Sequence, residues 1–233
     1  MTDVDDAGSS RRQVLRDSLA VSATTGAYAL SFGAVSIAAG LSVWQTMALS
    51  LLLFSGGSQF GMVGVIAGGG SPWAGAVTAV MLGARNMFYG LRLSMLLKVK
   101  GLRRLAAAQI VIDESAAMSM DRETEADGRT GFYATGIGIF VLWNLGTLIG
   151  ALGAAAFSDP AVLGLDAAAP AAFLALLAPR IRRRELWAVA VGAALLAVLA
   201  TPLVPPGVPV LIAALFGIVV GCWPRRAEVK EAE

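Results

Sequence analysis

The sequence predicts an all-α fold, a polytopic membrane helix bundle with about six to eight membrane segments. Hydrophobic residues make up 57% of the 233 residues and charged residues only 15%, with a mean hydropathy of +0.72. A soluble domain is about half apolar and a quarter charged, so much of the surface here must be apolar as well as the core. The basic residues also stand in short clusters between long apolar runs, as they do where membrane topology is encoded.

No linker between the apolar runs is long enough to separate domains. Residues 18–223 are therefore expected to form one transmembrane domain in the cell membrane, and the polar stretches 1–17 and 224–233 to be cytoplasmic tails. A membrane segment needs about 20 residues to cross a hydrocarbon core of about 30 Å, and the sequence predicts eight apolar segments of roughly this length. They are 18–40, 43–68, 72–97, 104–120, 130–156, 161–179, 185–204 and 208–223.

Clusters of lysine and arginine set the expected orientation, because cytoplasmic loops are enriched in both residues. The clusters lie at 11–16, 98–104, 180–184 and 225–230. Placing all of them in the cytoplasm, together with both termini, requires an even number of crossings between neighbouring clusters. Three segments lie between the first and second clusters and three between the second and third, so one segment of each group must fail to cross.

The two segments expected not to cross are 43–68 and 104–120. The first is interrupted by Ser55-Gly56-Gly57-Ser58-Gln59, and the second is short and contains Asp113-Glu114. Polar, irregular backbone is tolerated at membrane depth only where it faces protein or a water-filled cavity, which favours broken or re-entrant helices. Straight crossings with one misplaced basic cluster are the alternative. The stretch 25–29 also resembles 130–134, which is either an internal repeat of the kind found in transporters or chance.

Ionisable side chains inside apolar segments are candidate functional residues, because each costs at least about 2.5–3.5 kcal/mol at the bilayer centre. Arg85 lies in the middle of 72–97, and Asp113 and Glu114 follow an apolar run. One carboxylate is expected to neutralise Arg85 beside a polar cavity and the other to carry protons, since the chain has no histidine. The alternatives are an ion pair that only fixes helix packing, or carboxylates at a membrane interface.

The polar interruption at 54–60 is the second candidate site. Most glycine motifs in the chain are expected to serve close helix packing. The glycines at 56, 57 and 61 differ because hydroxyl and amide side chains surround them, and they can free backbone N–H and C=O groups to bind a zwitterion. Asn144 is expected to be either a cavity donor or an interhelical hydrogen-bond donor. The expected substrate-binding residues are Phe54, Ser55, Gly56, Gly57, Ser58, Gln59, Arg85, Asn86, Tyr89 and Asn144, and the expected proton-coupling residues are Asp113 and Glu114.

Enzyme functions are disfavoured by the sequence. It contains no P-loop, no HExxH motif and no nucleophile with a plausible base. The absence of histidine and the single cysteine, Cys222, exclude histidine-containing metal sites and disulfides. No metal, cofactor or nucleic-acid partner is expected. The stretch around Arg11 and Arg12 resembles a twin-arginine signal, but the apolar run after it is long enough to span and many more follow.

Three motifs together resemble the AzlC family, the large subunits of bacterial branched-chain amino acid exporters. They are Ser55-Gly56-Gly57-Ser58-Gln59-Phe60, the Arg85 motif ending in Tyr89-Gly90, and Asp113-Glu114, in this order and spacing. The resemblance runs over about residues 18–223. One departure is Gly83-Ala84, where many members have an asparagine before the arginine, and it bears on substrate identity more than on fold.

The resemblance implies secondary export of valine, leucine, isoleucine and similar hydrophobic amino acids, coupled to the proton gradient as proton antiport. It implies a small membrane subunit of the AzlD type as partner, and it matches Arg85 to the family's intramembrane arginine and Asp113-Glu114 to its acidic pair. Two alternatives stand beside this function: export of another small amphipathic organic acid, and a membrane subunit or scaffold without transport activity alone. A homo-oligomer is a further option for assembly.

Overall fold

The computed structural model describes residues 3–120, 122, 124–156, 181, 184–204 and 208–222. All secondary structure in this part of the chain is helical, which confirms the all-α class. The helices are α1 (Asp3–Ala38), α2 (Val43–Leu52), α3 (Gly56–Ala67), α4 (Pro72–Gly83), α5 (Arg85–Leu97), α6 (Leu102–Gln109), α7 (Asp113–Ser119), α8 (Glu125–Ala155), α10 (Arg184–Ala200) and α11 (Val208–Cys222). The expected segment 161–179 and the tail 224–233 lie outside the described residues.

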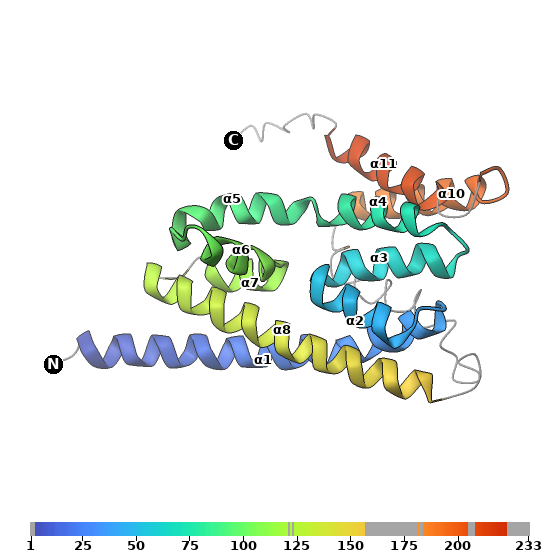
Figure 1. Cartoon of the computed structure of the whole chain (residues 1–233). Coiled ribbons are helices and arrows are strands. Elements are labelled where there is room, and N and C mark those ends of the chain that lie inside the picture. Colours follow the sequence, from blue (N-terminus) through green and yellow to red (C-terminus); the bar gives the residue numbers. More distant parts are fainter. Residues whose placement is uncertain are drawn as a thin grey trace, which may run out of the picture.

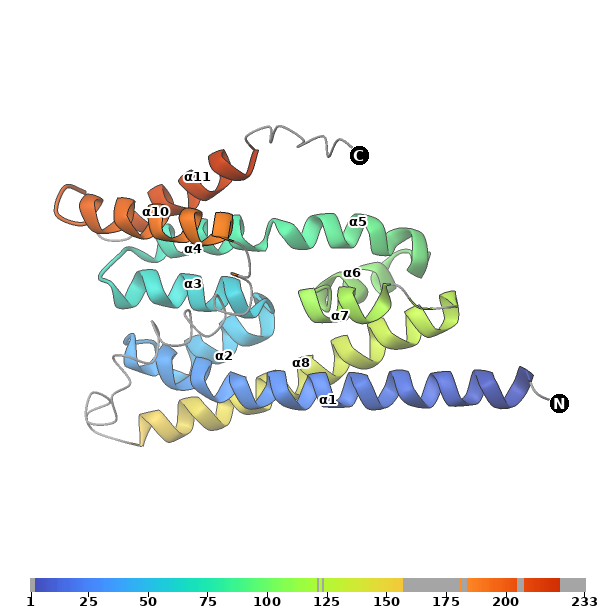
Figure 2. The same ribbon diagram turned by 180° about the vertical axis from the view of Figure 1, so that it is seen from behind.

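Helices α1 and α8 are the longest elements and run side by side in the same direction (Figures 1 and 2). Their backbones come into contact at small residues, and a Cβ atom on Gly33 would collide with the carbonyl oxygen of Thr147. Thr135 donates its hydroxyl to Ser18 Oγ at 2.9 Å in the same interface. Close glycine contacts and buried hydroxyl pairs hold helices together where water is absent. Because α1 begins at Asp3, most of the polar stretch expected as an N-terminal tail is helical.

Two segments fold into helical hairpins, and they are the two that the sequence marks as unable to cross. In 43–68, α2 and α3 are antiparallel around residues 53–55, so the chain returns to the end of the bundle from which it came (Figure 1). In 104–120, α6 and α7 turn back around residues 110–112 from the opposite end. Gln109 links the hairpins by donating Nε2 to the Leu51 carbonyl at 2.8 Å.

Local signals fix the outer ends of the first hairpin. Ser42 begins α2 with a capping box, in which the Gln45 side chain accepts from the Ser42 N–H at 2.8 Å and the Gln45 N–H donates to Ser42 Oγ at 3.3 Å. After α3 the chain turns through Gly69, whose φ of +80° favours glycine. Ser71 then caps α4, and Pro72 occupies the first helical position.

The tips of both hairpins lie near the middle of α8. Phe54, in the first tip, packs edge-on against Phe140 with ring centroids 5.0 Å apart. Ile110, in the second tip, lies against Gly136, where an added Cβ would be 3.0 Å from Ile110 Cδ1. Each hairpin therefore extends along about half of α8, and the non-helical backbone of both tips is brought together inside the bundle.

The segment 72–97 follows one path but is interrupted at Ala84, which the sequence did not indicate. Helix α4 ends at Gly83 and α5 begins at Arg85, with Ala84 at φ −56° and ψ −29°. Gly83 lets α4 come close to α3, since an added Cβ would lie 3.2 Å from Ser58 Oγ. The interruption places Arg85 in the first turn of a helix.

The outer faces of the helices are apolar. Arg11–Ala38 and Glu125–Ala155 are long and apolar enough to cross a membrane, judged by length and composition, and Val43–Leu52, Glu185–Ala200 and Val208–Gly221 are shorter apolar helices. Phe88 and Val198 are 67% and 68% exposed. Helices α10 and α11 pack against each other and lie over α4 (Figure 2). A helical bundle that is apolar outside as well as inside is the predicted membrane helix bundle.

Candidate functional site

An ion pair joins the starts of two helices at the hairpin tips. Arg85 Nη2 lies 2.8 Å from Asp113 Oδ2, and the side chains are 34% and 20% exposed. Arg85 is the first residue of α5, and Asp113 is the first residue of α7, where the helix dipole favours a negative charge. The expectation that a carboxylate neutralises Arg85 is thus matched by Asp113, and both side chains are partly accessible.

The start of α3 lies beside this ion pair. Ser55 is the N-cap residue but makes no side-chain cap hydrogen bond. Its Oγ instead accepts from Ser58 Oγ at 3.2 Å and, more weakly, from Asn86 Nδ2 at 3.5 Å. The first-turn N–H groups of α3 are therefore left without a side-chain cap, at the positive end of the helix. Arg85 borders this turn, because an added Cβ on Gly57 would lie 3.3 Å from Arg85 Nη2.

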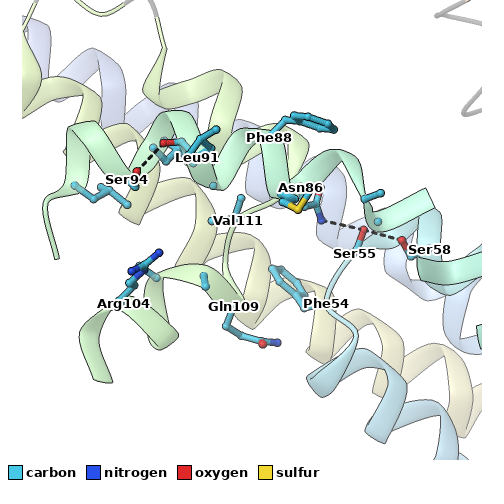
Figure 3. A pocket seen from close by; sticks show the side chains of 18 of the residues that line it. Phe54, Ser55, Ser58, Asn86, Phe88, Leu91, Ser94, Arg104, Gln109 and Val111 are labelled. Carbon is cyan, nitrogen blue, oxygen red and sulfur yellow. Dashed lines mark hydrogen bonds between the residues drawn. The ribbon is translucent and has the colours of Figure 1, made fainter. Parts of the chain in front are cut away.

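A groove of about 1260 Å³ lies between α5 and α6 and ends at the hairpin tips (Figure 3). Ser55, Ser58 and Asn86 line its inner end, and Phe54 forms part of its wall. Basic side chains line its other end. Arg85 and Asp113 are not among the lining residues, although Ala84 and Asn86, on either side of Arg85, are.

Buried polar atoms without a hydrogen-bond partner gather around the start of α3. Among the described residues they include Gln59 Oε1, Arg85 Nε, Asn86 Oδ1 and Trp143 Nε1. Gln59 is fully buried and donates Nε2 to the Leu49 carbonyl at 2.9 Å, which orients its other amide atom. Because buried polar groups are nearly always paired in proteins, such a concentration marks a place suited to a polar ligand.

An aromatic cluster lies next to these polar atoms. Trp143 is 3% exposed, and its ring would be 3.0 Å from a Cβ on Gly56. Phe60 packs edge-on against Trp143 at 6.5 Å and against Phe32 at 5.4 Å between ring centroids. The sequence-based set does not include Trp143 or Phe32. A tryptophan at the centre of 130–156, next to Asn144, was the only available signal.

The remaining predicted residues are more loosely related to the site. Tyr89 lies one helical turn after Arg85 and packs, half-buried, against the core. Glu114 follows Asp113 in the first turn of α7 and is half-buried. Asn144 donates Nδ2 to the Phe140 carbonyl at 2.7 Å within its own helix, so this bond is not the interhelical one that the sequence left open.

A model of a protein family described as AzlC protein matches residues 20–157, which is more than half of the chain. The chain belongs to the AzlC family. A curated relative, the inner membrane protein YgaZ of Escherichia coli (strain K12), is 27% identical over 218 residues, which cover 89% of this chain and 86% of the relative. No solved structure matches the chain.

Membership of the AzlC family gives the chain a transporter-type role in a membrane. The family match includes both hairpins, the interruption at Ala84 and the Arg85–Asp113 ion pair. Helices α10 and α11 lie beyond it. The candidate site is thus built entirely from the part of the chain that defines the family.

Proposed function

We propose that the protein is a secondary transporter that exports branched-chain amino acids such as valine, leucine and isoleucine across the inner membrane. The observation that carries the proposal is the Arg85–Asp113 ion pair beside the uncapped start of α3, at the tips of two half-length hairpins. Broken helices whose ends meet inside a bundle are a recurrent way to bind ions and small zwitterions in transporters. The location is supported by the printed name of the relative YgaZ.

The two charges of an amino acid match the two charges of the ion pair. The substrate carboxylate binds Arg85 and the first-turn N–H groups of α3, which both attract anions. The substrate ammonium binds Asp113 and the amide oxygen of Gln59, whose Oε1 has no partner among the described residues. The aliphatic side chain then lies against aromatic rings such as Trp143. A plain carboxylic acid would leave Asp113 without a positive partner from the substrate.

Competition for Asp113 provides the coupling to protons. An ionised Asp113 holds the substrate ammonium, and a proton on the same carboxylate removes the charge that holds it. The proton and the substrate therefore bind alternately rather than together, as antiport requires. Each lowers the protein's affinity for the other by the same factor. Glu114, the next residue, is the alternative proton carrier.

We further propose that the chain works with a small AzlD-type membrane subunit, and that a homo-oligomer is an alternative assembly. Measuring counterflow of labelled valine in proteoliposomes, first with the chain alone and then with the small subunit, separates the candidate functions. Activity with either preparation supports the transporter. Activity only with the subunit supports the two-subunit form, and counterflow of an organic acid but not of valine supports a different cargo.

The decisive variant is Arg85→Gln, with Arg92→Gln as its control. Arg92 lies on the same helix and is exposed, so its replacement removes the same charge away from the site. We expect Arg85→Gln to lower the initial rate of valine counterflow at least about tenfold, since charge-assisted hydrogen bonds are lost. Arg92→Gln should stay within about twofold of the wild type. Equal rates for both variants would refute the proposed site.

A further inference from the structure

We propose that the groove between α5 and α6 binds an anionic phospholipid, with its phosphate at Lys100 and Arg104 and one acyl chain along α5. The inference does not rest on the transported substrate, only on the chain lying in a membrane. The chemistry that identifies this ligand is the combination of a basic rim and an apolar trough in one continuous groove.

The rim of the groove is basic without compensating acids. Lys98, Lys100 and Arg104 line it, and no aspartate or glutamate does so among the described residues. Lys98 is already paired with Glu125 at 3.3 Å. No ion pair forms between Lys100 or Arg104 and another described residue, so both are free to bind a phosphate. Basic pockets at membrane interfaces are known to select anionic lipid headgroups.

The turn between α5 and α6 fixes this rim. Lys98 ends α5 with φ +53°, and Gly101 begins α6 with φ +58°. Two residues with positive φ within four positions reverse the chain and hold the basic residues at one end of the groove. Arg104 points from α6 towards α5 across the groove (Figure 3).

The trough beyond the rim is apolar and reaches the surface of the bundle. Phe88 and Leu91 line it and are 67% and 71% exposed, and Leu97 and Ala107 form its buried side. Water filling such a groove at membrane depth would find few polar partners. An acyl chain meets the same surface at no such cost.

The trough is long enough for an acyl chain to extend across one leaflet. Helix α5 has 13 residues, which corresponds to about 20 Å along the groove. One leaflet of a hydrocarbon core of about 30 Å is roughly 15 Å thick. A phosphate at Arg104 would therefore place the end of the acyl chain near Asn86 and Ser55, where it would close the hairpin tips off from the bilayer.

An amino acid is a poorer match for this groove. Its ammonium group would meet only cations at the rim, and its short side chain would leave most of about 1260 Å³ unfilled. The groove is thus separate in chemistry from the Arg85–Asp113 site, although both end at Ser55.

Native mass spectrometry of the purified full chain with equal amounts of phosphatidylglycerol and phosphatidylcholine tests the proposal. Wild-type protein should retain phosphatidylglycerol preferentially. The Lys100→Gln/Arg104→Gln variant should bind it about 25-fold more weakly, since each charge near the surface contributes about fivefold. Arg11→Gln/Arg12→Gln removes two basic residues outside the groove and should retain the wild-type preference. Equal retention by both variants would overturn the proposal.

A second variant tests the trough while leaving the rim intact. Gly90 lines the groove, and an added Cβ there would meet nothing within 4 Å, so Gly90→Phe is chosen to place a ring in the trough. We expect Gly90→Phe to lose bound phosphatidylglycerol although both cations remain. Retention of the lipid by Gly90→Phe would mean that the headgroup is attracted without an acyl chain in the groove. If Gly90→Phe instead displaces only a co-purified small membrane subunit, the groove is a protein interface. Retention of the lipid and loss of the subunit alone would each contradict the assignment.

Discussion

Arg85 and Asp113 are the first residues of two different helices, and their side chains meet at 2.8 Å where the two hairpins end. The interruption at Ala84 and the turn at 110–112 each place one partner at the start of a helix. The ion pair therefore depends on two breaks in helices rather than on two continuous ones. Its partial exposure leaves room for a ligand to compete for either charge.

Breaking this ion pair should destabilise the fold moderately, and removing both charges should restore part of the loss. We expect Arg85→Gln or Asp113→Asn alone to lower the free energy of unfolding by about 1–2 kcal/mol. This loss lies between those found on breaking exposed and buried ion pairs. The double variant should be more stable than the sum of the single effects predicts. Thermal unfolding in detergent measures all of them, and strictly additive losses would show that the charges are not coupled.

Adding one methyl group at Gly57 should affect substrate affinity more than stability. The new Cβ would lie 3.3 Å from Arg85 Nη2, the movable end of a flexible side chain, so the helix folds while the guanidinium shifts. We expect Gly57→Ala to raise the KM for valine roughly three- to tenfold, because a small displacement of a charged contact is costly. Gly153→Ala, where an added Cβ meets nothing within 4 Å, is the control and should leave the KM unchanged.

A methyl group at Gly33 should have the opposite pattern. There the added Cβ would press on the backbone of α8 at Thr147 and Ala151, which cannot move without separating the two long helices. We expect Gly33→Ala to cost about 1–3 kcal/mol of stability, the range found for overpacked cores. Thermal unfolding compares it with Gly153→Ala, and equal melting temperatures would show that the α1–α8 contact is looser than described.

The hairpin of α2 and α3 predicts which residues share a face of the membrane. Trp44 and Trp73 lie in the first turns of α2 and α4 and are 84% and 83% exposed. Both helices begin at the same end of the bundle (Figure 1). Tryptophan is enriched at membrane interfaces, and these two would anchor the face away from the basic clusters. In a Cys222→Ala background, Trp44→Cys and Trp73→Cys should both react with an impermeant maleimide from outside, and Lys100→Cys only from inside. Labelling of positions 44 and 73 from opposite faces would mean that 43–68 crosses.

Proton coupling should depend on Asp113 with a defined sign. A proton competes with the substrate ammonium for this carboxylate in the proposed exchange, so valine affinity should be higher at low than at high proton concentration. In Asp113→Asn the affinity should be lower and no longer change with pH over the same range. Counterflow at several pH values checks this, with Glu114→Gln measured alongside. A flat profile in Glu114→Gln and not in Asp113→Asn would assign the proton to Glu114.

The sequence predicted the broken segments because two independent signals agree on them. If all basic clusters are cytoplasmic, one segment in each group of three between neighbouring clusters must not cross the membrane. Polar residues inside 43–68 and 104–120 select these two segments, and both form hairpins. A carboxylate partner for Arg85 was also predictable, since a lone charge at membrane depth is costly. Whether Asp113 or Glu114 made the contact was not, because both are adjacent in sequence.

Other features depend on packing that no local pattern encodes. The interruption at Ala84 lies next to the close approach of α4 to α3 at Gly83, which exists only in the tertiary fold. Trp143 joins the site only because α8 passes behind the start of α3. The groove between α5 and α6 arises from two helices whose individual sequences show only an apolar face and a few basic residues.

In the proposed binding mode, the two charges of the substrate bind across the Arg85–Asp113 ion pair. The most direct measurement is the binding of valine and of its 2-oxo acid, which lacks the ammonium group, to wild-type and Asp113→Asn protein. The wild type should prefer valine by about 10- to 100-fold, the range of a charged hydrogen bond, and Asp113→Asn should lose most of that preference. If Asp113→Asn weakens the binding of both ligands equally, Asp113 does not bind the ammonium group and the proposed binding mode is wrong.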